Sequence, residues 1–129
     1  MRLRLLAAAL SLLAVAGACG TTRTHRVVTG TPGRPWNGYP SIVMDNEPAP
    51  GDFEEVAIVQ AVGSGTHADM PHVLNGLQEQ AASLGCNYVI RVHVDQGATI
   101  SSATGVAGRS RQQPRRPGMP MIAKDNDED

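Results

Sequence analysis

A strand–helix–strand pattern between residues 54 and 95 restricts the fold of this chain more than any other feature. Residues 54–62 form a run rich in valine and isoleucine, with apolar side chains on both faces, which is typical of a central strand. Apolar residues then recur at spacings of three and four, as in an amphipathic helix, at Val73, Leu74, Leu77, Ala81 and Leu84. Residues 88–95 alternate again as a strand. Such a unit joins two parallel strands of one sheet through a crossover helix.

Both ends of this helix carry typical signals. Asp69 is a candidate N-cap, and Pro71 falls in the first turn, where a missing N–H has no cost. Gly85 suits the position just past the helix, where φ is positive. Gly76, in the middle, predicts close packing of the helix on the sheet.

Two weaker segments complete the predicted fold. Residues 41–45 form a short apolar strand, and residues 98–106 form a strand rich in threonine, serine and alanine. The element order is therefore β-β-α-β-β, an α/β (α+β) class with a small mixed sheet and one covering helix. The sheet face away from the helix carries Arg91, His93 and Glu55, and is either solvated or a docking surface.

The N-terminus predicts export. Arg2 and Arg4 precede an apolar run at residues 5–15, and small residues follow at 16–18. The run is shorter than the roughly 20 apolar residues that span a bilayer, so residues 1–18 are interpreted as a cleaved signal peptide. Ala16, Gly17 and Ala18 form an A-x-A site for signal peptidase I, which would release a soluble periplasmic protein.

The alternative depends on Cys19, which directly follows that cleavage site. Gly17-Ala18-Cys19 resembles the end of a lipobox, the bacterial lipoprotein signal, although Ala16 stands where leucine is usual. That resemblance implies a diacylated Cys19 as the new N-terminus. Because Gly20 follows instead of the aspartate that retains lipoproteins at the inner membrane, it also implies an outer-membrane anchor facing the periplasm.

The mature chain has room for one domain. Residues 19–38 are interpreted as a flexible tether, residues 39–108 as the small α/β domain, and residues 109–129 as a disordered charged tail. Eleven basic and 12 acidic side chains give a net charge of −1, which does not favour nucleic-acid binding. The chain holds 2 cysteines, so lipidation of Cys19 would leave Cys86 without a disulfide partner; otherwise a Cys19–Cys86 bridge becomes an option.

Candidate chemistry centres on histidines. His67, Asp69 and His72 lie close together in sequence and, with His93 or Cys86, form a weak candidate site for zinc or copper. Their spacing matches no dedicated motif, and a capping aspartate flanked by exposed histidines is preferred. No catalytic constellation and no cofactor site is predicted: Ser64 lacks a G-x-S-x-G setting, and Gly63-Ser64-Gly65 lacks a P-loop lysine.

Three segments together carry a family resemblance: residues 53–60, residues 77–90 with the junction Leu84-Gly85-Cys86-Asn87, and residues 103–107. They resemble the superfamily of YbjQ-type proteins, called heavy-metal-binding by name, and the Rcs envelope-stress lipoproteins. Within that pattern Cys86 replaces the usual alanine and implies a small buried site.

The lipid signal, the predicted tether and the small domain together predict a non-enzymatic envelope lipoprotein. Its small domain would be an interaction or sensing module, held to the membrane by its lipid and binding an envelope protein or polysaccharide. A metal-binding or metal-responsive periplasmic protein and a soluble periplasmic protein remain as alternatives.

Overall fold

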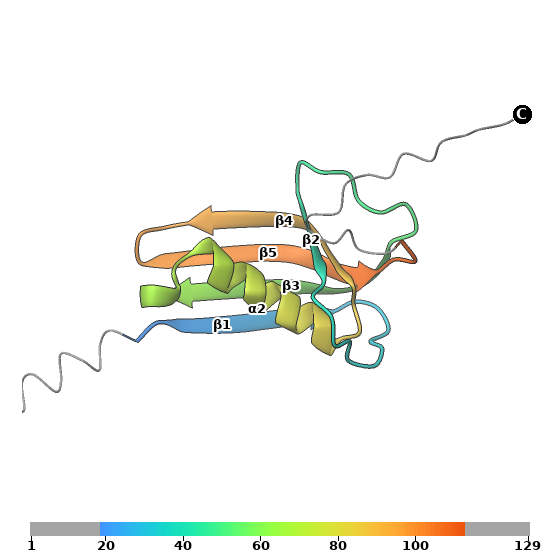
Figure 1. Ribbon diagram of the computed structural model, residues 1–129, viewed down its shortest axis with the longest axis horizontal. Coiled ribbons are helices and arrows are strands. Elements are labelled where there is room, and N and C mark those ends of the chain that lie inside the picture. The colour runs from blue at the N-terminus through green and yellow to red at the C-terminus, as the bar shows by residue number, and fades with distance from the viewer. Residues whose placement is uncertain (1–18, 113–129) are drawn as a thin grey trace, which may run out of the picture.

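A computed structural model describes residues 19–112 of the chain (Figure 1). The predicted signal peptide and residues 113–129 of the predicted tail lie outside these residues. Within residues 19–112, five strands form one sheet with one α-helix on it, so the predicted mixed α+β class is confirmed. The elements are β1 (Thr21–Val28), β2 (Ser41–Met44), β3 (Glu54–Ser64), the 3₁₀ turn η1 (Gly65–His67), α2 (Met70–Ser83), β4 (Tyr88–Gln96) and β5 (Ile100–Arg109).

The sheet has the order β1-β3-β5-β4-β2. β3 pairs antiparallel with β1 and with β5, and β4 also pairs antiparallel with β5. The two strands that flank α2 are therefore parallel to each other, as predicted, with β5 between them. β2 pairs in parallel with β4 and forms one edge of the sheet.

β1 corrects the prediction of a flexible tether. Thr21–Val28 pairs with β3 along its whole length, from Thr21 opposite Ser64 to Val28 opposite Ala57. The strand lacks apolar alternation, but it is rich in β-branched residues, which favour extended backbone. Thr22 and Thr24 turn their methyl groups toward Gly76 of α2. Only Cys19 and Gly20 remain between the predicted cleavage site and the folded domain.

The segment after β1 is also attached to the domain. Backbone N–H groups of Gly33 and Trp36 donate to the carbonyls of Leu84 and Ala82 at the end of α2, at 2.9 Å and 2.8 Å. At the other terminus, Arg109 belongs to β5 and Ser110 is buried. The ordered domain therefore extends beyond both predicted boundaries, 39 and 108.

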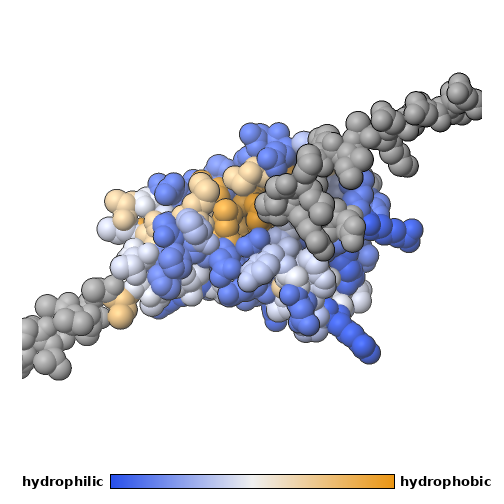
Figure 2. All heavy atoms as spheres, in the orientation of Figure 1, coloured by the Kyte–Doolittle hydropathy of each residue, from blue (hydrophilic) through white to orange (hydrophobic). Residues whose placement is uncertain are grey.

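α2 packs on one face of the sheet and forms the core with it. The Asp69 carboxylate caps the helix by accepting from the backbone N–H of His72, and Gly85 has a φ of 77°, both as predicted. The cluster has 13 fully or almost fully buried residues: Val56, Ala57, Val59, Ala61, Val73, Leu77, Ala81, Leu84, Cys86, Val89, Val92, Ala103 and Ala107. Ile42, Met44, Leu74 and Val94 pack against it and are only partly buried. Figure 2 shows a mostly hydrophilic surface with one hydrophobic area near the middle of the view.

A β-bulge in β4 changes the predicted face of several side chains. Ile90 and His93 pair with Val106 and Thr104, so β4 has one extra residue between them. Arg91 lies in this bulge with a φ of 51°, an uncommon value for a residue with a side chain. Simple alternation placed Ile90 and Val92 on the same face. The bulge instead places Val92 with Val89 in the helix-side core, and Ile90 on the opposite face.

Candidate functional site

Cys19 lies at one end of the sheet, directly beside the first strand. Its side chain is exposed, and the N–H of Gly20 donates to Thr66 Oγ1 of η1 at 2.9 Å. Thr21 then pairs with Ser64, which in turn pairs with Ile100 of β5. The start of β1, η1 and the β4–β5 hairpin therefore form one end of the molecule, and β5 ends at the other (Figure 1).

Two apolar side chains at the Cys19 end are exposed to solvent. Ile100 begins β5 and is 60% exposed, and Met70 begins α2 just after η1 and is 40% exposed. Neither belongs to the core cluster. This end thus combines a free cysteine with apolar side chains.

The structure brings His67, Asp69 and His72 together. The two imidazole rings stack with centroids 4.0 Å apart and an interplanar angle of 15°. His72 Nδ1 lies 2.5 Å from Asp69 Oδ1, and His67 Nδ1 lies 3.0 Å from Thr22 Oγ1. The hydrogen bond with the His72 side chain, followed by that from its backbone N–H, lowers the pKa of Asp69.

This geometry favours a helix cap over a metal centre. Nitrogen lone pairs lie in the imidazole plane, so two stacked, nearly parallel rings direct them side by side instead of toward one ion. Within residues 19–112, no group of three or more histidine, cysteine, aspartate or glutamate side chains is placed to hold a metal ion.

His93 lies elsewhere, between two carboxylates. Its Nδ1 is 3.2 Å from Asp45 Oδ2, just after β2, and its Nε2 is 3.3 Å from Asp95 Oδ1 in β4. The hydrogen bond with Asp45, together with the nearby charge of Asp95, raises the pKa of His93. Sequence reasoning named His93 but missed both partners. Asp95 could have been found, because it lies two positions along the same strand face, whereas Asp45 required the parallel pairing of β2 with β4.

Cys86 is a buried thiol, as the sequence predicted. Its side chain is 0% exposed, and burial raises its pKa to about 11. The thiol is therefore protonated at neutral pH, and its burial makes it a poor nucleophile there. Of the described cysteines, only Cys19 is accessible for modification.

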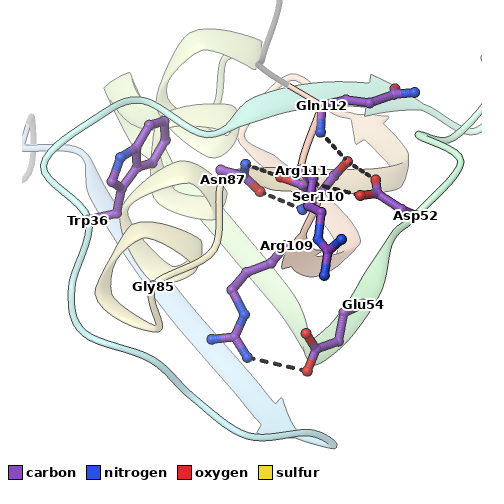
Figure 3. Close-up of a pocket in the computed structure, with 9 residues that line it drawn as sticks. All are labelled: Trp36, Asp52, Glu54, Gly85, Asn87, Arg109, Ser110, Arg111 and Gln112. Carbon is purple, nitrogen blue, oxygen red and sulfur yellow. Dashed lines mark hydrogen bonds and ion pairs between the residues drawn. The ribbon is translucent and has the colours of Figure 1, made fainter.

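A hollow of about 750 Å³ lies at the end far from Cys19 (Figure 3). Most of its polar groups bind one another. Asp52 accepts from Ser110 Oγ at 2.5 Å and from Arg111 N at 3.0 Å, and Asn87 exchanges two hydrogen bonds with the Ser110 backbone. Arg109 donates to Glu54 at 3.4 Å. These contacts hold the end of β5, and no local sequence pattern indicates them because they join segments that are distant in the chain. The lining residues are Trp36, Asp52, Glu54, Gly85, Asn87, Arg109, Ser110, Arg111 and Gln112.

The sheet face opposite α2, called here the open face, presents side chains in three rows across four strands. Thr22 and Thr24 face α2, so alternation along β1 places Arg23, His25 and Val27 on the open face. Strand register gives the rest of each row. The rows are Arg23–Val62–Ser102–Asp95, His25–Gln60–Thr104–His93 and Val27–Ile58–Val106–Ile90.

Comparisons with protein-family models, with curated proteins and with solved structures found no match to this chain. The resemblance drawn from residues 53–107 therefore stays a prediction. Among the helices within residues 19–112, none is long and apolar enough to cross a membrane.

Proposed function

We propose that this chain is a non-enzymatic lipoprotein of the bacterial envelope, anchored through a diacylated Cys19. The observation that carries the proposal is the position of Cys19, exposed and one residue from the first strand, directly after a segment with the features of an export signal. Cys86, the other cysteine, is buried with a protonated thiol and is unsuited to modification.

An anchor at this position orients the domain. Cys19 and Gly20 can span at most about 7 Å, so the Cys19 end lies against the bilayer surface. The exposed side chains of Ile100 and Met70 then contact the lipid headgroup region, where apolar side chains are favoured. β5 has 10 residues and extends about 33 Å away from this end.

The orientation also selects the part of the domain that faces the periplasm. The far end carries Trp36, which is 39% exposed, and the basic side chains Arg109 and Arg111. An aromatic ring and guanidinium groups around one hollow suit the binding of a protein or a polysaccharide of the envelope. We therefore assign this end, and not the histidine groups, to the binding of an envelope partner.

The test is the intact mass of the mature protein, made from the full chain in a bacterium that processes lipoproteins. We expect a chain that begins at residue 19 and carries a diacylglyceryl group on Cys19. We also expect the protein to fractionate with the outer membrane and to need detergent for extraction.

Two single substitutions provide matched controls. Cys19→Ser removes the modified thiol, and its product should lack the lipid mass and leave the membrane fraction. Cys86→Ala removes the other cysteine and should leave both readouts unchanged. An unmodified Cys19 in the wild-type protein would refute the anchor and support release by signal peptidase I.

A further inference from the structure

The open face combines apolar and oppositely charged side chains in an order that fits a second copy of itself. In the row nearest Cys19, Arg23 lies on β1 at one side and Asp95 lies on β4 at the other. Both side chains belong to exposed residues. In the row farthest from Cys19, two apolar side chains are exposed to solvent: Val27 is 63% exposed and Ile58 is 43% exposed.

We propose that the open face is a self-association surface, on which two copies of this chain pack sheet against sheet about a two-fold axis parallel to the strands. Such an axis, placed between β3 and β5, sets β1 of one copy opposite β4 of the other. Each row of side chains then faces the same row of the second copy. Arg23 then faces Asp95 of the second copy, and Ile58 faces its Val106. Each contact occurs twice, as a two-fold interface requires.

The direction of the axis follows from the charges. A two-fold axis across the strands would place β1 opposite β1, so Arg23 of one copy would meet no carboxylate of the other. The axis along the strands pairs opposite charges in the first row and sets the exposed Ile58 against Val106 in the third, where Ile90 is already buried. The strands of two sheets packed face to face are aligned to within about 30°. At such an angle, the side chains of each row still lie opposite the same row of the second copy.

The same axis is compatible with an anchored domain. Rotation about a line parallel to the strands leaves both Cys19 residues at the same end of the dimer, so two lipids can enter one membrane. The self-association itself does not depend on the lipid, and it can be tested with a chain that lacks it.

The size of the face indicates the class of interface to expect. β1 has 8 residues, and four strands about 4.8 Å apart give a footprint of about 500 Å². A standard stable interface buries about 800 Å² per partner, so this one falls in the weak class. We therefore expect a weak, reversible dimer, and confinement of both copies to one membrane would raise the dimer population.

Sedimentation equilibrium on residues 19–129 with Cys19→Ser tests the proposal, because this chain contains every described element and cannot form a Cys19 disulfide. We expect a monomer–dimer equilibrium between about 1 µM and about 1 mM. Arg23→Glu and Asp95→Arg should each weaken the dimer by about tenfold, because each places like charges opposite each other at two symmetric positions.

The double variant Arg23→Glu/Asp95→Arg distinguishes this arrangement from a general loss of structure. It exchanges the two charges and should restore the dimer to within about threefold of the wild type. Arg26→Glu is the matched control. Arg26 lies on the same strand but faces α2, where it donates to Ser83 Oγ at 3.1 Å. Reversing the charge at this position should therefore leave the dimer unchanged.

Three outcomes would overturn the proposal. The first is that residues 19–129 stay monomeric at all concentrations. If dimers then form only after residues 113–129 are removed, the face is assigned to that segment instead of to a second copy. The second is a double variant no tighter than its single parents. The third is equal weakening by Arg26→Glu and Arg23→Glu.

Discussion

Gly76 is the point where α2 comes closest to the sheet, and its replacement gives the sharpest test of the helix–sheet packing. A Cβ added at Gly76 would lie 2.9 Å from the Cβ of Ala61 in β3, and 3.3 Å from the Cγ2 atoms of both Thr22 and Thr24 in β1. Ordinary carbon contacts are about 3.5–4.0 Å. The threonines can rotate, but the Cβ of Ala61 is fixed to its backbone, so α2 must move outward by about 0.6–1 Å.

Two opposing effects set the magnitude for Gly76→Ala. Alanine favours the helix over glycine by about 1 kcal/mol. Overpacking of a close contact costs about 1–3 kcal/mol, and the value should lie in the upper part of this range because moving α2 also loosens the contacts of the fully buried Val73 and Leu77. We expect a net loss of about 1–2 kcal/mol in the free energy of unfolding.

Urea unfolding followed by circular dichroism measures this loss. Asn75→Ala is the matched control: it is exposed on the neighbouring position of the same helix and should change stability by less than about 0.5 kcal/mol. Ala61→Gly removes the opposing Cβ, so Gly76→Ala should cost at least about 1 kcal/mol less in that background. A stabilising Gly76→Ala, or strictly additive effects in the double variant, would refute the close approach.

Three further predictions concern titratable groups. For Cys86, the thiol pKa is about 11 in the folded chain against an ordinary 9.0, so unfolding in this pH range releases a proton and stability should fall by about 2 kcal/mol from about pH 9 to about pH 11. Urea titrations should show this loss in the wild type but not in Cys86→Ala. Because the pKa of His93 is raised in the folded chain, the protonated imidazole stabilises the fold. This stabilisation is lost as pH rises through that pKa. An NMR titration should show a lower His93 pKa in Asp45→Asn, and an unchanged value would contradict the pairing. Asp52 holds the end of β5 by accepting from Arg111 N, and its own pKa is lowered by hydrogen bonds. Asp52→Asn should therefore speed tryptic cleavage after Arg111, whereas an equal rate would show that the contact does not order this end.

The elements that sequence reasoning found are those whose periodicity reflects burial. α2 has its apolar spacing, its Asp69 cap and its Gly85 terminus because one helix face packs on the sheet. β3 is an inner strand between β1 and β5, and its buried residues Val59 and Ala61 pack in the core with α2. In these segments the local pattern and the tertiary contacts favour the same structure.

β1 was missed for a physical reason. Threonine methyl groups at positions 22 and 24 do the packing that larger apolar side chains usually do, because Gly76 lets α2 approach closely. A strand of this kind looks polar in sequence. The glycine in the helix was the available signal, and it indicated close packing without showing what would fill the space.

The place of β5 in the sheet was also not predicted from the sequence. Its small residues predicted a weak strand, yet it lies in the middle of the sheet. A Cβ at Gly105 would meet Val89 Cγ1 at 2.6 Å and Val92 Cγ2 at 2.9 Å, so the small residue makes room for larger ones on β4. The bulge at Arg91 brings Val92 onto this side, and no periodicity rule anticipates a one-residue change of face.

The finding that Cys19 lies beside a strand changes how an anchored protein of this kind would act. A flexible tether of 20 residues would allow a root-mean-square reach of about 25 Å, and the domain could turn freely. A link of only Cys19 and Gly20 spans about 7 Å, so reach must come from the domain itself. The rigid strands provide it, because β5 places Arg109 about 33 Å from the Cys19 end. If Cys19 carries the proposed anchor, such a domain would hold its far end at a fixed height above the membrane and would suit a partner that comes to that height.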